Sequence, residues 1–171
     1  MKNKRTLVCV AALAGFFATS ANADVFIGGG VSNNSYGYDN VENSTGSQLY
    51  VGYYFDSGVF LEISKVDLGE ADIENDPRSL EMSGIAYYAG YKSETSPGFG
   101  WYAKAGMYSF ETELSGTAKE DSSGLSIGAG IMYAFNKNFA LRAGLQTFVG
   151  VEDFDQDQSV FGGSVGLEAR F

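Results

Sequence analysis

The sequence predicts an all-β fold, an eight-stranded antiparallel up-and-down transmembrane β-barrel, and three observations support this prediction. The final segment, 159–171, alternates apolar and polar residues up to Phe171, which is the period of a strand with one apolar face. Seven further segments alternate in the same way, and short and long connections between segments also alternate, as in membrane barrels. After residue 23 no apolar run reaches the roughly 18 residues of a spanning helix. A form that crosses a membrane would therefore be a closed barrel.

The first 23 residues have the pattern of a secretory signal peptide. Three basic residues open the chain: Lys2, Lys4 and Arg5. An apolar run at 7–18 and a small-x-small site at 21–23 follow, so we expect cleavage between Ala23 and Asp24. Residues 24–171 would then form one outer-membrane β-barrel domain. Its thiol count would be zero because Cys9 lies in the removed segment, so disulfides could not hold it.

The eight expected strands share a face of apolar side chains and a face of small or polar ones. They are 25–32, 47–55, 59–66, 80–92, 99–110, 124–135, 139–150 and 159–171. In the first, three consecutive glycines at 28–30 indicate relief of crowding or a bend rather than a nucleotide site, since no helix follows. In the second, one face holds Leu49, Val51, Tyr53 and Phe55, and the other holds Gln48, Tyr50, Gly52 and Tyr54. The third to eighth segments alternate in the same way. Both prolines fall between strands, as a hydrogen-bonded sheet requires.

Aromatic residues bracket the short connections expected at 56–58, 93–98 and 136–138. They are Phe55, Tyr91, Phe99, Phe135 and Phe139, and Phe171 is expected at the same end. This pattern predicts an aromatic girdle at one membrane interface. The alternative is that aromatics simply flank turns, as they do in many β proteins.

Charge is unevenly distributed. The net charge of −10 becomes −13 once the three basic residues of the leader are removed, which argues against nucleic acid as a partner. The long connections expected at 33–46, 67–79, 111–123 and 151–158 are acidic. Asp153, Asp155 and Asp157 resemble the start of a calcium loop, but the sixth-position Gly is missing and Ser164 stands where Glu is needed. A solvated acidic loop is the favoured reading, and no metal or cofactor is expected.

Three charged residues interrupt the small and polar face near the middle of their strands: Glu62, Lys104 and Arg142. Their shared parity places them inside the barrel at a similar height, and Glu168 points the same way. Two acids and two bases in a narrow lumen can neutralise each other, and an eight-stranded barrel is only wide enough for its own side chains. We therefore expect a plug rather than a catalytic site or a pore. No His is present, so the common nucleophile–base pairs and zinc sites are excluded, and the chain is not expected to be an enzyme.

Several stretches resemble the small OmpA-like outer-membrane barrels. They are 87–91 with 101–106, 128–135 with 138–144, and the terminal 167–171. In that family inward acids and bases form a salt-bridge cluster, which the resemblance implies for Glu62, Lys104, Arg142 and Glu168. The terminal stretch ending in Phe171 looks like the signal that the barrel assembly machinery reads. The chain stops at the barrel, so the resemblance is to members without a peptidoglycan-binding domain.

These expectations combine into a protein of the cell outer membrane, exported through the cleaved leader. It would have a plugged polar lumen and acidic extracellular loops, with a structural or surface-interaction role such as adhesion to a host or contact with lipopolysaccharide. Its expected partners are outer-membrane lipid and lipopolysaccharide, the assembly machinery, and a surface ligand at the loops. The alternative is a small porin-like barrel that allows limited diffusion of ions or small solutes. A soluble lipocalin-type barrel would need the opposite parity at Glu62, Lys104 and Arg142.

Overall fold

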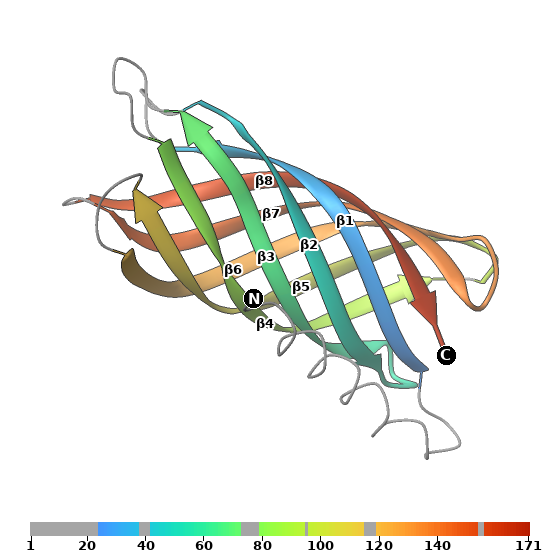
Figure 1. Cartoon of the computed structure of the whole chain (residues 1–171). Helices are drawn as coiled ribbons and strands as arrows, with labels where there is room; N and C mark the ends of the chain where they lie inside the picture. Colours follow the sequence, from blue (N-terminus) through green and yellow to red (C-terminus); the bar gives the residue numbers. More distant parts are fainter. Residues whose placement is uncertain (1–23, 38–41, 73–78, 95, 115–118, 154–155) are drawn as a thin grey trace, which may run out of the picture.

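The protein is a closed barrel of eight antiparallel strands (Figure 1). The computed structural model describes residues 24–37, 42–72, 79–94, 96–114, 119–153 and 156–171. The strands are β1 (Asp24–Tyr36), β2 (Ser44–Tyr54), β3 (Val59–Asp72), β4 (Ser79–Glu94), β5 (Gly98–Leu114), β6 (Lys119–Ala134), β7 (Phe139–Asp153) and β8 (Gln156–Arg170). Within these ranges no helix is long and apolar enough to span a membrane.

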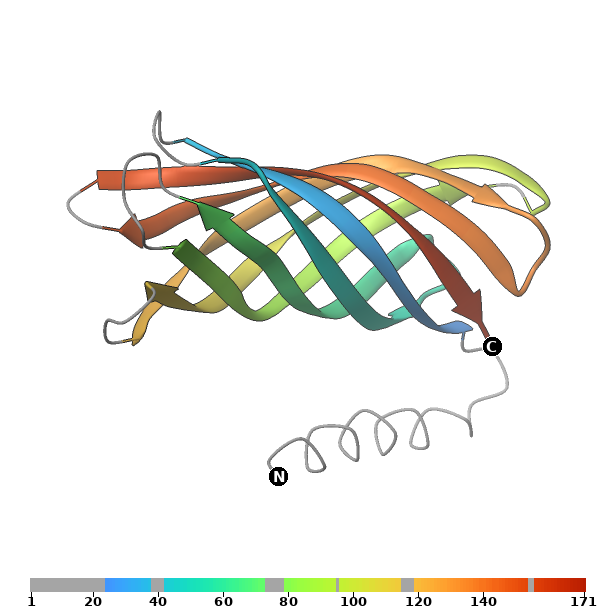
Figure 2. The same cartoon turned by 45° about the horizontal axis from the view of Figure 1, so that its top comes forward.

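Each strand pairs with its neighbours in sequence, and the ends of the chain close the circle. β1 pairs with β8 from Phe26 opposite Arg170 to Tyr36 opposite Val160. The eight strands therefore leave no unpaired edge, which removes the usual site of strand addition between molecules. The strands are steeply inclined to the barrel axis (Figure 2), as closure of a sheet requires.

The two ends of the barrel differ. At the short-turn end, 55–58, 95–97 and 135–138 connect the strands; Gly58 there has φ +85°, a conformation that favours glycine. At the opposite end, called here the hairpin end, the strands run further than the sequence predicts. β3 continues to Asp72 instead of ending at 66, and β5 continues to Leu114 instead of 110. The expectation of long loops is therefore wrong for much of 67–79 and 111–123.

The reason is that ladder hydrogen bonds do not depend on an apolar face. The alternation ends where the outward side chains become polar, but the backbone pairing continues beyond that point. In β3 it continues through a bulge between Asp67 and Glu70. Gly69 supplies φ +81° there, and its N–H donates to Asp67 Oδ1 at 2.9 Å. Glu70 and Asp72, expected in a loop, consequently lie on β3.

The outer wall carries the predicted apolar face. Large apolar side chains are exposed on all eight strands, for example Leu49, Ile85, Met107, Leu125 and Leu145. At the short-turn end many of the exposed side chains are aromatic, and pairs of rings touch: Phe99 and Tyr133 lie 4.7 Å apart between centroids. Phe171 lies at this end too (Figure 2) and is 74% exposed. The predicted girdle is confirmed as an arrangement of side chains.

The lumen is filled in three layers. Toward the short turns lies a mainly aromatic cluster of Phe26, Tyr50, Tyr54, Phe60, Tyr102 and Met132, of which Tyr50 and Tyr102 reach Arg142 at the charged level. Buried charged side chains form the middle layer. Nearest the hairpin end is an apolar layer of Tyr36, Val66, Leu68, Ala71, Leu80, Met82, Ala86, Tyr88, Tyr108, Phe110, Phe148 and Val160. The lumen is polar in the middle of the barrel, and the half nearer the hairpin end is mainly apolar but also buries Asn34, Ser44, Thr112 and Ser122. The prediction of a polar lumen is therefore correct in part.

Candidate functional site: a charged cluster in the lumen

The four charged residues predicted from strand parity meet in one network. Glu62 on β3 receives Lys104 Nζ of β5 on Oε1 at 2.8 Å and Arg142 Nη1 of β7 on Oε2 at 2.8 Å. The same Arg142 Nη1 lies 3.2 Å from Glu168 Oε2 on β8. All four side chains are buried. These contacts bring the four side chains together inside the barrel, as their shared strand parity indicates.

A fifth charge, Arg170, belongs to the network and was not predicted. Its Nε donates to Glu168 Oε1 at 2.7 Å, and the side chain is 5% exposed. The signal was present in the sequence, because Arg170 has the same parity as Glu168 two residues earlier. Sequence analysis did not assign Arg170 to the cluster, because it lies next to the last residue of the chain. The network thus holds three cations against two carboxylates.

Hydroxyl groups complete the coordination of the two carboxylates. Tyr54 donates its phenolic hydrogen to Glu168, with both carboxylate oxygens at 2.9 Å, and Ser64 Oγ donates to Glu62 Oε1 at 2.9 Å. Buried carboxylates are stable only when their lone pairs are satisfied in this way. Sequence reasoning places Tyr54 on the inward face of its strand but does not identify its direct bond to the cluster.

Aromatic rings flank the cations of the cluster. The guanidinium carbon of Arg142 lies 4.7 Å from the Tyr50 ring centroid and 4.4 Å from that of Tyr102. Lys104 Nζ lies 4.0 Å from the centroid of Tyr88. Such contacts favour a desolvated cation electrostatically. They hold the Arg142 head between two rings and leave little freedom to the side chain.

Glycines make this packing feasible. A Cβ at Gly28 would overlap the ring of Tyr50, and one at Gly144 would overlap the hydroxyl of Tyr102. Both tyrosines contact Arg142, so the glycines give room to the rings that position the cation. The expectation that glycines 28–30 relieve crowding is confirmed for Gly28.

Little open space remains beside the network. A cavity of about 10 Å³ lies among groups from β2, β3, β5, β7 and β8. Its polar border consists of Gln48, Tyr50, Glu62, Tyr102, Lys104, Arg142, Gln146 and Ser164, together with Leu145 and Gly166. This volume is about the space of one water molecule. On the hairpin side, Gln146 Nε2 donates to Tyr88 Oη at 2.8 Å, and Tyr88 is also within 3.1 Å of Ser126 Oγ. Each charged side chain of the network therefore has a partner of opposite charge, and the open space beside them is about that of one water molecule.

The structure describes the remaining predicted residues only in part. Asp155 lies outside the described residues, as do the side chains of Asp153 and Asp157, whose backbones belong to β7 and β8. Among the described residues no group of three or more metal-ligating side chains gathers. Ala23 is also outside the described part, and β1 begins at Asp24, so cleavage there stays a prediction. Phe171 follows β8, and its N–H donates to Val25 O at 2.9 Å.

Comparison with known proteins identifies the family. A family model described as the outer membrane protein beta-barrel domain matches residues 7–171. The chain belongs to this family. The match and the closed barrel together place it in the outer membrane. A search of curated protein sequences finds no significant match.

Solved structures show the same fold at low sequence identity. Neisserial surface protein A is 15% identical with a TM-score of 0.63, covering 88% of this chain and 98% of its own. Ail, the attachment invasion locus protein of Yersinia pestis, is 15% identical with a TM-score of 0.63, covering 88% and 99%. OprG of Pseudomonas aeruginosa is 14% identical with a TM-score of 0.63, covering 89% and 97%. Identities this low establish a shared fold.

Proposed function

We propose that the protein is a surface barrel whose lumen is closed and whose activity resides at its hairpin end. The observation that carries this proposal is the five-charge network that crosses the lumen from β3 to β5, β7 and β8. A hydrated ion passing this layer would have to displace ion pairs, and only about 10 Å³ stands open beside them. Breaking a buried pair costs about 3–5 kcal/mol.

The apolar layer adds a second obstruction. Phe110 lies 4.6 Å from Tyr108 and 4.9 Å from Phe148 between ring centroids, and all three side chains point inward. Apolar constrictions exclude ions because they offer no polar atoms to replace water. Both layers therefore support a closed barrel, and neither brings together groups suited to catalysis, so we propose a non-enzymatic role.

The two ends fix the proposed orientation. Outer-membrane barrels have short periplasmic turns and larger extracellular excursions. The short-turn end with its aromatic girdle would face the periplasm, and the hairpin end, where strands extend past the apolar wall, would face the exterior. The terminal Phe171 would then lie on the periplasmic side, where the assembly machinery reads a last strand.

The exterior end carries acidic side chains in register. Glu81 on β4 is paired with Glu70 on β3 and with Glu113 on β5, and Glu111 is paired with Asp121 on β6. Like charges opposite each other lower the stability of a sheet. A charged exterior that is retained despite this effect supports an interaction with a basic partner surface. Ail of Yersinia pestis has been solved with sucrose octasulfate, a heparin analogue; the acidic rim here supports the opposite charge preference.

A porin-like role remains the second candidate, and the polar border of the small lumen cavity favours it. Transient separation of Arg142 from Glu62 would join that cavity to the short-turn side. Passage to the exterior would still have to cross the apolar layer.

The decisive experiment is conductance of the purified protein in planar bilayers. We expect no steady current, because both layers are closed. A stable current in the wild-type protein would overturn the closed-barrel proposal. Binding to polycationic and to heparin-coated surfaces tests the rim: we expect binding to the first, lost with Glu81→Lys and Glu111→Lys together. Equal retention on both surfaces, or on heparin alone, would contradict the proposed preference.

A further inference from the structure

Lys65 is a cation on the outer wall of a membrane barrel. It lies on β3, is exposed, and continues the outward parity of Leu61 and Ile63. Its paired neighbours are apolar, Leu49 on β2 and Ile85 on β4. A lipid-facing Lys costs about 2–4 kcal/mol at mid-bilayer and far less near an interface. The free-energy cost of the Lys65 charge therefore depends on how far this residue lies from the middle of the bilayer.

The pairing register places Lys65 at the boundary of the apolar wall. The next outward row toward the short turns is apolar and consists of Val51, Ile63 and Tyr87. The next row toward the hairpin end is polar and consists of Ser47, Asp67 and Ser83. A Lys stem is long enough to lie along the apolar row while its ammonium reaches the polar one. In a membrane whose apolar core matches the apolar rows, the ammonium would reach the level of the lipid head groups.

The part of the chain that the structure describes does not neutralise this charge. Among the described residues no salt bridge or hydrogen bond joins Lys65 Nζ to another side chain. The neighbouring acid, Asp67, accepts the Gly69 N–H on Oδ1 at 2.9 Å. Further along the wall toward the exterior, the described strand positions carry Glu70, Glu81 and Glu113. Lys65 is therefore the cation that an anionic head group would contact on this part of the wall.

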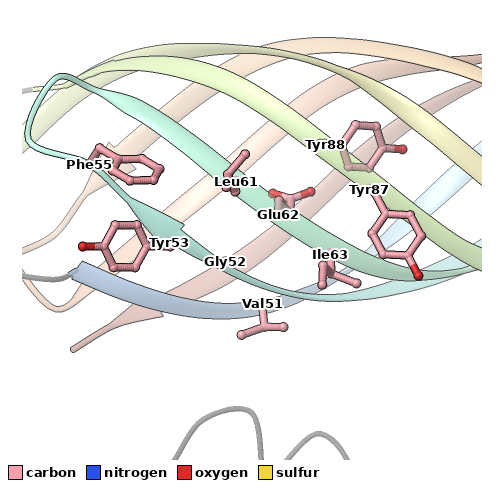
Figure 3. Close-up of a pocket in the computed structure, with 9 residues that line it drawn as sticks. All are labelled: Val51, Gly52, Tyr53, Phe55, Leu61, Glu62, Ile63, Tyr87 and Tyr88. Atoms are coloured by element: carbon pink, nitrogen blue, oxygen red, sulfur yellow. The ribbon is translucent and has the colours of Figure 1, made fainter. Parts of the chain in front are cut away.

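An apolar pocket lies directly below Lys65 on the same three strands. Outward side chains of Val51, Tyr53, Phe55, Leu61, Ile63 and Tyr87 line it on β2, β3 and β4 (Figure 3). Glu62 and Tyr88 also border it, but their side chains are buried in the lumen, so the backbone forms this part of the floor. The pocket therefore offers an apolar surface for an acyl chain that descends from a head group held at Lys65.

We propose that this wall is a binding site for lipopolysaccharide, with a lipid A phosphate at the Lys65 ammonium and an acyl chain against Ile63 and Tyr87. The proposal rests on the orientation given under the proposed function, because only the outer leaflet carries lipopolysaccharide. Attraction between one Lys and an anionic lipid surface is about 1 kcal/mol, which corresponds to about a fivefold change in affinity.

The test uses the protein extracted from outer membranes, freed of lipid in detergent, and titrated with diphosphorylated lipopolysaccharide. We expect Lys65→Gln to weaken binding about fivefold and Lys65→Arg to retain it. Lys137→Gln, at an exposed short turn, is the matched control and should change nothing. Ile63→Trp should weaken binding by obstructing the pocket, whereas Ile127→Trp on the wall of β6 should not. Gel mobility with and without boiling confirms that each variant is folded.

Each outcome decides between named alternatives. Equal binding by wild type and Lys65→Gln, or equal losses from Lys65→Gln and Lys137→Gln, would overturn the site. Dephosphorylated lipopolysaccharide should bind wild type and Lys65→Gln alike, and a remaining difference would overturn the phosphate contact. If phosphatidylglycerol shows the same dependence on Lys65, the commitment to lipopolysaccharide fails and the orientation is called into question. Bilayer current and binding to polycationic surfaces do not depend on Lys65, so failure there would concern the closed-barrel and rim proposals alone.

Discussion

The charged layer in the middle of the lumen and the apolar layer nearer the hairpin end fill the barrel by different physical means. The middle layer uses five charges whose ion pairs have distances of 2.7–3.2 Å. The apolar layer uses aromatic and aliphatic side chains, with Phe110 at its centre and less than 2% exposed. Both are carried by the same strands: Glu62 and Val66 lie four residues apart on β3. The difference shows that one inward face can change from polar to apolar within a few residues.

This difference predicts how each layer responds to damage. Ion pairs are directional, and removal of one partner leaves a buried charge without compensation. Apolar packing is not directional, and removal of one ring leaves a cavity that its neighbours partly fill. The charged layer should therefore be the more sensitive to a single substitution.

The largest expected effect is that of Glu62→Ala. Glu62 accepts bonds from Lys104, Arg142 and Ser64, so its loss leaves two buried cations short of a partner. We expect the free energy of unfolding to fall by about 3–5 kcal/mol. The measurement is urea-induced unfolding in lipid, followed by gel mobility. Glu81→Ala, an exposed acid on β4, is the control and should not lower the free energy of unfolding, because it removes only the like-charge pairing with Glu70 and Glu113. Equal stability of the two variants would show that the network does not hold the barrel together.

A smaller effect is expected from Phe110→Ala in the apolar layer. The lost ring contacts with Tyr108 and Phe148 should lower the free energy of unfolding by about 3 kcal/mol. Phe161→Ala, on the outer wall and half exposed, provides the matched control and should have a smaller effect, because lipid replaces the lost contacts. A greater loss for Phe161→Ala than for Phe110→Ala would contradict tight packing of the apolar layer inside the lumen.

Current in planar bilayers tests whether the charged layer and the apolar layer each close the lumen without the other. If each layer closes the lumen alone, Arg142→Ala and Phe110→Ala should each remain silent, and the combined variant should conduct. A steady current from Arg142→Ala by itself would mean that the apolar layer does not block ions.

Much of this arrangement was predictable because a strand has a strict period of two. Parity alone placed Glu62, Lys104, Arg142 and Glu168 inside, and the closed register confirms it. Val66, Met82, Phe110 and Phe148 are also inside, but they were not predicted, because an apolar residue at an inward position looks the same in the sequence as the end of the alternating pattern. For the same reason the strands appeared to stop near 66 and 110, where outward residues become polar although backbone pairing continues.

Contacts across the barrel were less accessible to sequence reasoning. Tyr54 and Glu168 are 114 residues apart, and only the curvature of the closed sheet brings the hydroxyl to the carboxylate. Which of several inward tyrosines meets an acid depends on strand stagger, which parity does not specify. The outward Lys65 could have been found, since it breaks the apolar face of β3 two residues after Ile63.

The smallest expected effect isolates one of these long-range contacts. Tyr54→Phe removes the hydroxyl that bonds Glu168 at 2.9 Å but leaves the ring stacked on Phe26 at 4.2 Å. Glu168 keeps Arg142 and Arg170 as partners, so we expect a loss of about 1.5 kcal/mol, the size of one hydrogen bond to a charged group. Tyr133→Phe on the outer wall of β6 is the control, because its printed contacts are ring contacts with Phe99 and Phe135, which the substitution keeps. If both variants lose the same stability, the Tyr54 hydroxyl does not connect β2 to the charged layer.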